Sequence, residues 1–488
     1  MNVLMLNPPY YAKYSSSQRS PGVIKSGVIY YPIWLAYATG VLEQHGLNVR
    51  LVDAPAAGLS LRQVLSLVEE FDPRLVVINT STPSIFNDID VAQAIKSLTP
   101  GVVVALVGPH VSALPVETLE TNTAIDAVAR GEYDYTIRDL ALAVQSGAAW
   151  DGVLGLSYRR PITRHNGRLG EIVSNPDRPF ITDLDNLPFV TEVYARHLDV
   201  RNYFYSITQY PEVALITGRG CPYQCTFCVW PQTLMGHSYR TRSVENVADE
   251  FEYIARQWPQ VKEVFIEDDT LTVDKQRAVA LAQELTRRDV NLPFTANSRA
   301  DVDPETLYWL GQAGLRLLCV GFESADQTVL DALKKNIKVA RFYQFSEDAA
   351  RLGILVHGCF IGGNPDDTKE TLARTLQLAK DLNLDSAQFF PMMVYPGTEA
   401  YAWATRNGYL ITEDFREWLT PDGLHRSTVS RSDLSAAEIL TWCNHARRSF
   451  YLRPRYVAAK FWQVVSHPHE ARRILKSAHI FARHLSRP

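Results

Sequence analysis

Short apolar runs alternate with helical patterns twice along this chain, and this alternation is the strongest constraint on its fold. The apolar runs of the first series are residues 2–7, 48–53, 75–81, 102–108 and 125–131. Between them lie stretches such as residues 32–46, whose apolar residues recur at intervals of three and four. Strands that alternate with helices in this way predict a doubly wound parallel sheet, which is a Rossmann-like α/β domain over residues 1–150.

The second series begins at residues 213–220. Its further apolar runs are residues 261–268, 292–298, 315–324, 354–363 and 387–395. Helical patterns such as residues 244–258 separate them. Six β/α units predict a partial (β/α)6 TIM-like barrel over residues 206–400, with its active site at the carboxyl ends of the strands.

Two other regions differ from these series. In residues 151–205, Asn166-Gly167 gives the turn signal of a hairpin and is followed by a linker rich in proline and aspartate. Residues 401–488 form a helical, basic C-terminal region, in which residues 446–488 hold ten Lys or Arg against one acid, a local charge of +9. Two interpretations of this charge stay open, a solvated helical face or contact with an anionic surface such as a membrane.

The composition limits the class of protein. It is 46% hydrophobic and 21% charged with a net charge of −4, so no excess charge points to nucleic acid. The start, MNVLMLNPPYY, lacks a basic n-region and a cleavage site, and no run of about eighteen apolar residues occurs. We therefore expect a cytoplasmic protein. Its six cysteines are too few for a disulfide framework and are expected to be reduced.

Three of these cysteines, Cys221, Cys225 and Cys228, lie in one loop directly after the first strand of the second series. A structural zinc site needs four ligands, and His237 is the nearest candidate for the fourth. A four-iron cluster normally takes four thiolates, so three thiols leave one iron open to an outside ligand. This pattern favours a [4Fe–4S] cluster in an enzyme. The alternative is a non-enzymatic interaction module that binds zinc or an iron–sulfur cluster.

With Phe227 before the third cysteine, CPYQCTFC resembles the signature of radical S-adenosylmethionine (SAM) enzymes. In that family SAM chelates the open iron, and the reduced cluster cleaves it to a 5'-deoxyadenosyl radical. The resemblance therefore implies SAM as a cofactor and an electron donor as a partner. It also implies a set of SAM-binding residues, which are Phe227, Glu267, Asp268, Ser298, Glu323 and Gly362.

The strand-end residues also have structural interpretations. Asp269 or Thr270 would only cap the next helix, and Gly362 would only supply a turn. Cysteines within apolar runs are usually small core residues. We therefore predict core positions, outside the site, for Cys319, Cys359 and Cys443.

Turn residues after the strands of the first series resemble the cobalamin-binding domain of class B radical SAM enzymes. A ligand of a doubly wound sheet binds in the crevice at the carboxyl edge. No GxGxxG follows the first strand, which argues against a dinucleotide, and no DxHxxG offers a histidine as lower cobalt ligand. The residues that the resemblance assigns to cobalamin are Asn7, Pro8, Thr80, Ser81, Gly108, His110, Gly131 and Glu132.

The resemblance covers residues 1 to about 400. GRGCPYQCTFCVWPQT and KEVFIEDDT are similar to the hopanoid-associated enzymes that make the cyclitol ether of bacteriohopanetetrol, although residues 364–367 read NPDD in place of the usual LPGE. The expected substrate is a small molecule or a lipid (hopanoid-like), a glycan or another specialised metabolite. Methyl transfer and a rearrangement or carbon–carbon coupling both remain open. If the substrate is a lipid, we expect the protein to bind peripherally to the inner face of a membrane.

Overall fold

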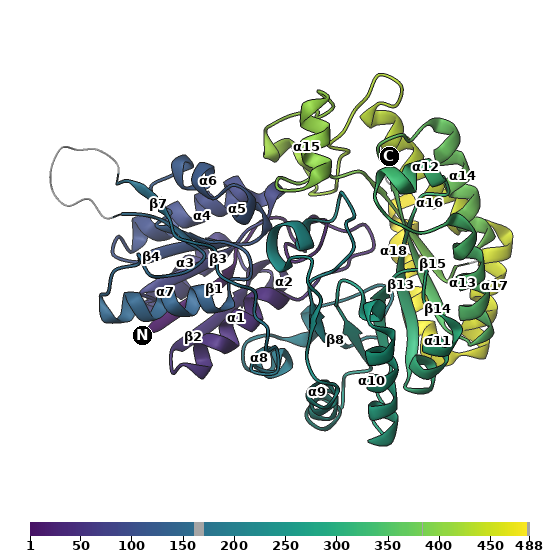
Figure 1. The fold of residues 1–488 in the computed structure, drawn as a ribbon, viewed down its shortest axis with the longest axis horizontal. Coiled ribbons are helices and arrows are strands. Elements are labelled where there is room, and N and C mark those ends of the chain that lie inside the picture. Colours follow the sequence, from purple (N-terminus) through teal and green to yellow (C-terminus); the bar gives the residue numbers. More distant parts are fainter. Residues whose placement is uncertain (161–169, 383, 486–488) are drawn as a thin grey trace.

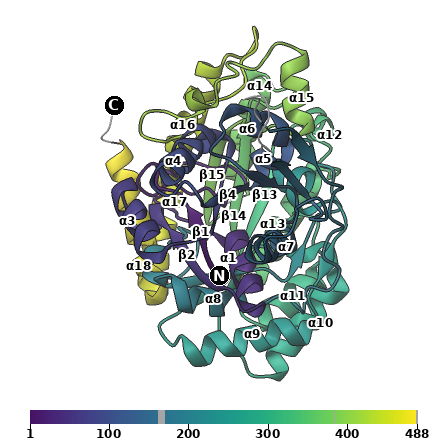
Figure 2. The ribbon, with the colours of Figure 1, turned by 90° about the vertical axis from the view of Figure 1, so that its left-hand side faces the viewer.

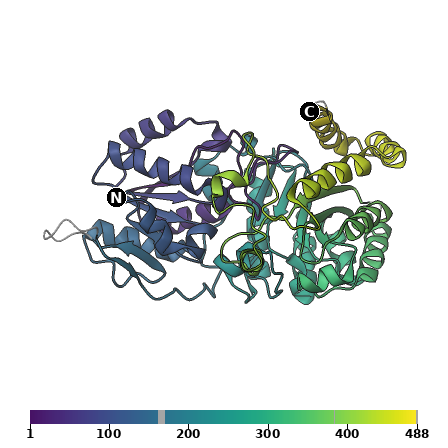
Figure 3. The ribbon, with the colours of Figure 1, turned by 90° about the horizontal axis from the view of Figure 1, so that it is seen from above.

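A computed structural model describes residues 1–160, 170–382 and 384–485. Two sheets lie side by side, the first from the N-terminal part of the chain and the second from its middle (Figures 1 and 3). Figure 2 looks from the side of the first sheet, with the strands of the second sheet behind it. Residues 436–485, which form the last three helices, lie along the outer side of the second sheet, far from the first (Figure 1).

The first sheet has the order β2-β1-β3-β4-β5-β6-β7, with β1 to β5 parallel and the β6–β7 hairpin antiparallel. Its strands are β1 Asn2–Asn7, β2 Asn48–Asp53, β3 Leu75–Asn79, β4 Val103–Val107, β5 Ala127–Ala129, β6 Leu156–Arg159 and β7 Ile172–Ser174. The predicted doubly wound sheet is confirmed, and the hairpin extends it. The predicted turn at Asn166-Gly167 lies outside the described residues, and the domain boundaries stay a prediction.

Helices cover both faces of this sheet because successive side chains of a strand point to opposite faces. In β1, Val3 and Met5 pack with one pair of helices, whereas Leu4 and Leu6 pack with another. The first pair is α1 Ile33–Gln44 and α7 Asp134–Ser146, and the second is α3 Leu61–Phe71 and α4 Ile85–Leu98. Because both faces of the sheet are buried, the sequences of these strands are continuous apolar runs.

The second sheet has six parallel strands in the order β15-β14-β13-β12-β11-β8. The strands are β8 Glu212–Leu215, β11 Glu263–Ile266, β12 Phe294–Ser298, β13 Leu315–Glu323, β14 Leu355–Gly362 and β15 Ser386–Pro391. The helices between them are α9 Val244–Gln257, α10 Lys275–Arg287, α11 Pro304–Gln312, α12 Gln327–Ala332, α13 Val339–Arg351 and α14 Lys369–Asp381. The strands β8 and β15 are the two edges, so the predicted partial barrel is confirmed.

Side-chain caps begin several of these helices. Asp274 accepts a hydrogen bond from the backbone of Arg277 and caps α10, and Thr368 caps α14 with a capping box. The interpretation of Asp269 or Thr270 as the cap of this helix is therefore wrong. Both residues instead line a cavity at the carboxyl end of the sheet.

The C-terminal helices are α15 Glu399–Arg406, α16 Ala436–Tyr451, α17 Pro454–Ser466 and α18 Pro468–Leu485. Of these, α16 packs along the edge strand β15. The hydroxyl of Tyr451 accepts a hydrogen bond from the Ala387 N–H at 3.0 Å and donates to the Ala387 carbonyl at 2.8 Å. These bonds satisfy backbone groups that an edge strand would otherwise leave unpaired.

Some basic side chains of the C-terminal region point into the protein and not to the solvent. Lys460 and Arg473 both bind the buried carboxylate of Asp385, at 2.5 and 3.1 Å, and Phe450 is fully buried. The expectation that this region is only a solvated or membrane-facing surface is wrong for these residues. Among the described residues, no helix is both long and apolar enough to span a membrane.

A buried arginine joins the two sheets. Arg219, in the short strand β9 Gly218–Arg219, has no exposed side-chain surface and binds Glu132 at 2.9 Å and Asp134 at 2.8 Å. Glu132 also binds Arg240 at 2.8 Å. Since both carboxylates follow β5 of the first sheet, these ion pairs hold the cysteine loop against that sheet.

We predict that Arg219→Met destabilises the apoprotein by about 3–5 kcal/mol, because it leaves the buried carboxylate of Asp134 without a guanidinium partner and removes one of the two that bind Glu132. The measurement is the first unfolding transition in denaturant. The control is Arg416→Met, which removes an exposed arginine paired with Asp414. Equal stability of the two variants would contradict the structural role of Arg219.

Candidate active site

The three-cysteine loop lines a cavity of about 280 Å³ at the carboxyl end of the second sheet. The side chain of Gln232 holds this loop in shape. Its Nε2 donates to the carbonyl oxygens of Cys225 and Thr226, each at 3.2 Å, and of Cys228 at 2.8 Å. One side-chain amide therefore fixes three carbonyls of the loop while the thiols stay turned to the cavity.

The environment of Cys221 and Cys228 favours the protonated form of their thiols until a metal binds. Burial raises the pKa of Cys221 to about 11, with Asp269 as a further cause, and burial also raises the pKa of Cys228. A metal that displaces these protons removes the penalty of a buried thiolate. The set of three thiols with free space before them fits a four-iron cluster that keeps one iron open.

His237 does not complete a zinc site with this loop. Its Nδ1 lies 3.0 Å from the carbonyl oxygen of Cys221, and the residue does not line the cavity. The zinc interpretation therefore lacks the fourth ligand that it required.

Three of the residues predicted to bind SAM line the same cavity, Phe227, Ser298 and Glu323. Glu323 is buried and forms an ion pair with Lys335 at 2.9 Å. Its backbone has a φ of +64°, a conformation that costs a non-glycine residue of order 1–3 kcal/mol and that is concentrated at functional sites. Gly321 permits this arrangement, because an added Cβ there would lie 2.2 Å from the Glu323 carboxylate.

Glu267 is paired with an arginine that the sequence analysis missed. Arg19 binds Glu267 at 2.9 Å and Asp269 at 3.1 Å, and its guanidinium lies 4.2 Å from the centre of the Trp230 ring. Burial raises the pKa of Glu267 to about 7, against the opposing effect of Arg19. A single arginine in a long loop carries no sequence signal of this role, since its partners lie about 250 residues away.

Like Glu267, Asp268 and Gly362 do not line the cavity. Asp268 accepts hydrogen bonds from the backbone and hydroxyl groups of Thr217, each at 2.6 Å, so it positions the chain that leads into the cysteine loop. Gly362 packs against the ring of Trp442 in α16. Their assignment to SAM stays a prediction, but the contacts of both residues are structural.

The sequence analysis also misplaced two cysteines. Cys319 in β13 and Cys359 in β14 line the cavity together with His357. Their assignment as core residues is wrong, because they lie on the side of the strands that faces into the partial barrel. Cys443 is buried in a small apolar cluster, as predicted.

The residues predicted to bind cobalamin lie at the carboxyl edge of the first sheet, where residues 8–31 fold over it. Ser16 donates to the side-chain oxygen of Asn7 at 2.7 Å, and the hydroxyl groups of Tyr14 and Ser81 lie 2.7 Å apart. Pro8 follows β1 and is buried. Hydroxyl and amide groups therefore dominate this edge.

The loops after β3 and β4 meet closely at this edge. Gly108 has a φ of +122°, and an added Cβ would lie 2.3 Å from the carbonyl oxygen of Thr80, so glycine is required there. His110 is buried with its Nδ1 3.2 Å from the hydroxyl of Thr82. Burial lowers the pKa of His110 to about 3, which keeps the imidazole neutral.

The loop after β5 has a different role from the one predicted. The N–H of Gly131 donates to the hydroxyl of Ser112 at 3.0 Å, but the carboxylate of Glu132 is occupied by Arg219 and Arg240. The other groups at the edge are hydroxyls, amides, backbone atoms, the imidazole of His110 and the buried carboxylate of Asp53, which accepts a hydrogen bond from Asn7 at 2.8 Å. These are donors and acceptors for the amide side chains and phosphate of a corrinoid, so the donor set fits cobalamin. The individual contacts stay a prediction.

Two family models match the chain. The B12 binding domain matches residues 19–141, and the Radical SAM superfamily matches residues 215–379. The first match runs from the loop before α1 into α7 and includes β2 to β5 of the first sheet, and the second runs from the end of β8 into α14. The cysteine loop lies within the second match.

Curated relatives match most of the chain. An uncharacterized methyltransferase of Pyrococcus horikoshii is 30% identical over 426 residues, which are 87% of this chain and 88% of that protein. The cytidylyl-2-hydroxyethylphosphonate methyltransferase of Streptomyces wedmorensis is 26% identical over 436 residues, 79% of each chain. The hopanoid C-3 methylase of Methylococcus capsulatus is 25% identical over 395 residues, 79% of this chain and 70% of that protein.

A solved structure shares the fold. The radical SAM methyltransferase TsrM of Kitasatospora setae, with tryptophan and a SAM analogue bound, superposes with a TM-score of 0.66 at 18% identity. The superposition covers 91% of this chain and 87% of TsrM. The arrangement of both sheets and the C-terminal helices is therefore that of a known methyltransferase fold.

We predict that replacing Cys221, Cys225 and Cys228 together with alanine lowers the iron content from about four per chain to about zero. Iron analysis and the visible spectrum measure this after anaerobic reconstitution. The control is Cys443→Ala, which removes a thiol outside the cavity and should retain the iron. A triple variant that still holds about four iron atoms per chain would refute the cluster assignment.

Proposed function

This chain belongs to the radical SAM enzymes that carry a B12-binding domain, and from that premise we propose that it methylates an unactivated carbon of an apolar, lipid-like substrate with an anionic group. Its cofactors are a [4Fe–4S] cluster, SAM and cobalamin. Together these groups supply one-electron cleavage of SAM and a transferable methyl group. The finer likeness to the hopanoid cyclitol ether enzymes is not confirmed by the relatives and stays a prediction.

We assign the cofactors to the residues whose positions fit them. Cys221, Cys225 and Cys228 would hold the cluster. Glu323, held by Lys335, and Asp269, bound by Arg19, line the cavity and offer acceptors for the hydroxyl and amino groups of SAM. Glu267 also binds Arg19 but does not line the cavity, so its contact with SAM stays a prediction. The carboxyl edge of the first sheet would hold cobalamin. The ring of Phe227 forms part of the cavity wall and limits the access of water to it.

A second cavity supports the proposed substrate class. It has a volume of about 510 Å³, within the range of ligand pockets, and it shares His357, Gln388 and Phe390 with the first cavity. Its walls come from residues 23–26, β15 and helices α16 to α18. Apolar groups such as Ile24, Phe389 and Phe481 predominate. An elongated apolar molecule fits a path from this cavity to the cluster cysteines.

Two cations in this cavity lack an acidic partner among the described residues. Lys25 and Arg447 both donate to the side-chain oxygen of Asn444 at 3.1 Å, and neither forms an ion pair there. Burial lowers the pKa of Lys25 to about 8, with the positive charge of Arg447 as a further cause. An anionic group of a substrate would neutralise both charges, and this is the observation that carries the substrate class.

The proposal is tested with SAM that carries a deuterated methyl group. The reduced, cobalamin-loaded enzyme is incubated anaerobically with a solvent extract of cell lipids. We expect the label in an acidic lipid, with S-adenosylhomocysteine and 5'-deoxyadenosine formed together. Formation of 5'-deoxyadenosine without S-adenosylhomocysteine would contradict methylation, and label in a neutral or water-soluble product would contradict the substrate class.

With the labelled lipid as substrate, Arg447→Ala should raise the KM by roughly tenfold, the effect of losing one hydrogen bond to a charged group. The control is Arg448→Ala, which removes the neighbouring exposed arginine. Steady-state kinetics measure both variants. An unchanged KM for Arg447→Ala would contradict the assigned anion site.

We further propose that α17 brings the enzyme to an anionic membrane surface. Val457, Phe461, Trp462 and Val465 share one face of this helix, and Phe461 and Trp462 are 71% and 69% exposed. Exposed arginines at positions 448 and 455 lie near this face in the sequence. An exposed aromatic face beside cations is typical of an interfacial helix.

At low salt the protein should sediment with vesicles of phosphatidylglycerol, and the double variant Phe461→Ser, Trp462→Ser should stay in the supernatant. Binding should weaken as salt rises, because exposed charges are screened beyond about 8 Å at physiological ionic strength. Tyr308→Ser, which removes an exposed aromatic ring on α11, is the control. Equal sedimentation of all variants, or none by the unmodified protein, would contradict membrane contact.

A further inference from the structure

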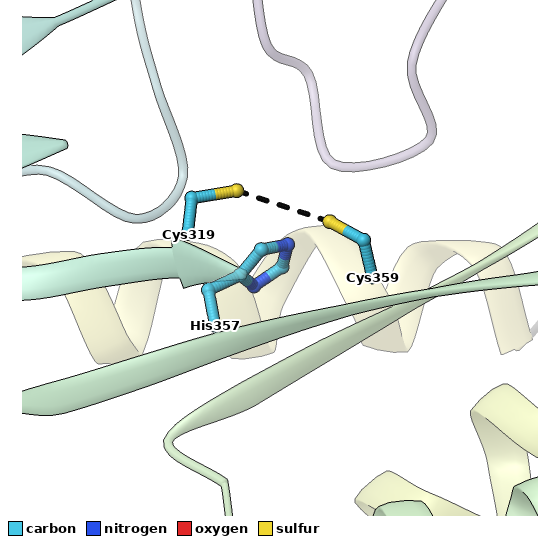
Figure 4. Close-up of side chains that lie close together, drawn as sticks. All are labelled: Cys319, His357 and Cys359. Atoms are coloured by element: carbon cyan, nitrogen blue, oxygen red, sulfur yellow. Dashed lines mark hydrogen bonds between the residues drawn. The ribbon is translucent and has the colours of Figure 1, made fainter. Parts of the chain in front are cut away.

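A second group of soft metal ligands lies in the cavity, apart from the three-cysteine loop. Cys319 and His357 are direct neighbours across the β13–β14 pair. Cys359 is two residues after His357 in β14, so both side chains lie on the same face of that strand. Figure 4 shows the imidazole of His357 beside the two sulfur atoms. All three residues line the cavity that the cluster cysteines also line.

The spacing of these ligand atoms matches one metal ion. The Sγ atoms of Cys319 and Cys359 lie 3.8 Å apart, and one ligand atom from each of the three residues lies within 4.8 Å of the others. Two sulfurs at about 2.3 Å from one tetrahedral zinc ion are separated by about 3.8 Å. A disulfide requires about 2.05 Å, which these sulfurs do not approach.

The surroundings prepare His357 to act as a ligand. Its Nδ1 lies 2.8 Å from the hydroxyl of Ser386, and such a bond fixes the ring and leaves Nε2 to bind a metal. Binding of a divalent ion would release the two thiol protons. The resulting site, one dication with two thiolates and a neutral imidazole, carries no net charge inside the barrel.

We propose that Cys319, His357 and Cys359 form a zinc site with an open fourth position toward the cavity. Three protein ligands with one free position are the pattern of a catalytic zinc site, whereas structural sites are closed by four. The free position faces the space where the two cavities meet, because His357 lines both. It would take an oxygen or sulfur ligand from a substrate. Metal binding at this site does not depend on the proposed methylation.

The test uses the reconstituted holoenzyme, so that the three-cysteine loop is filled with iron and cannot take up zinc. The protein is equilibrated with zinc and freed of excess by gel filtration. We expect about one zinc ion per chain, and zinc-edge X-ray absorption should show two sulfur ligands with nitrogen or oxygen completing the shell. Zinc at background level in the unmodified holoenzyme would overturn the proposal, as would a disulfide between Cys319 and Cys359.

Two variants test the ligands. Cys359→Ser and His357→Ala should each lose the zinc while their iron content and cluster spectrum are unchanged, which shows that the barrel is folded. The matched control is Cys443→Ser, which removes a buried thiol that lines the second cavity but not the cavity of the three ligands, and it should keep the zinc. Retention of zinc with two sulfur ligands in Cys359→Ser would overturn the assignment.

Discussion

The buried side chain of Arg219 is the interaction on which the arrangement of this enzyme depends. It lies two residues before Cys221 and binds two carboxylates that follow the fifth strand of the first sheet. A buried guanidinium without these partners would carry a large desolvation penalty, so the two sheets are held in one relative position. The carboxyl edge of the first sheet therefore faces the loop that carries the three cysteines. The cluster site and the cobalamin site both depend on this fixed position of the two sheets.

Asp268 and Gln232 also hold the three-cysteine loop in position. Asp268 holds the chain before the loop through Thr217, and Gln232 holds the carbonyls of the loop itself. Neither residue lines the cavity with the acceptors Glu323 and Asp269. The loop is thus fixed by side chains behind it, and this leaves the thiols and the space in front of them for cofactors.

The sequence predicted the parts of the structure that depend on local patterns. Buried parallel strands require continuous apolar runs, so both sheets could be read from those runs, and three thiols in one loop indicated the cluster. Contacts between distant segments could not be predicted. Arg19 meets Glu267 only because residues 8–31 fold over the barrel, and Cys319 meets Cys359 only through the register of β13 and β14. From the sequence alone, a cysteine in an apolar strand is predicted to be a core residue. Only the fold shows whether its side of the strand faces a cavity instead.

The C-terminal helices complete the barrel on its open side. Tyr451 pairs with the backbone of β15, and Asp385 is neutralised by Lys460 and Arg473. Behind this cover lies the cavity that we assign to the substrate. The most direct test of the account is Mössbauer spectroscopy of the ⁵⁷Fe-reconstituted protein with and without SAM. SAM is expected to make one iron of the cluster distinct from the other three, whereas an unchanged spectrum would contradict an open iron facing the cavity that the three cysteines line.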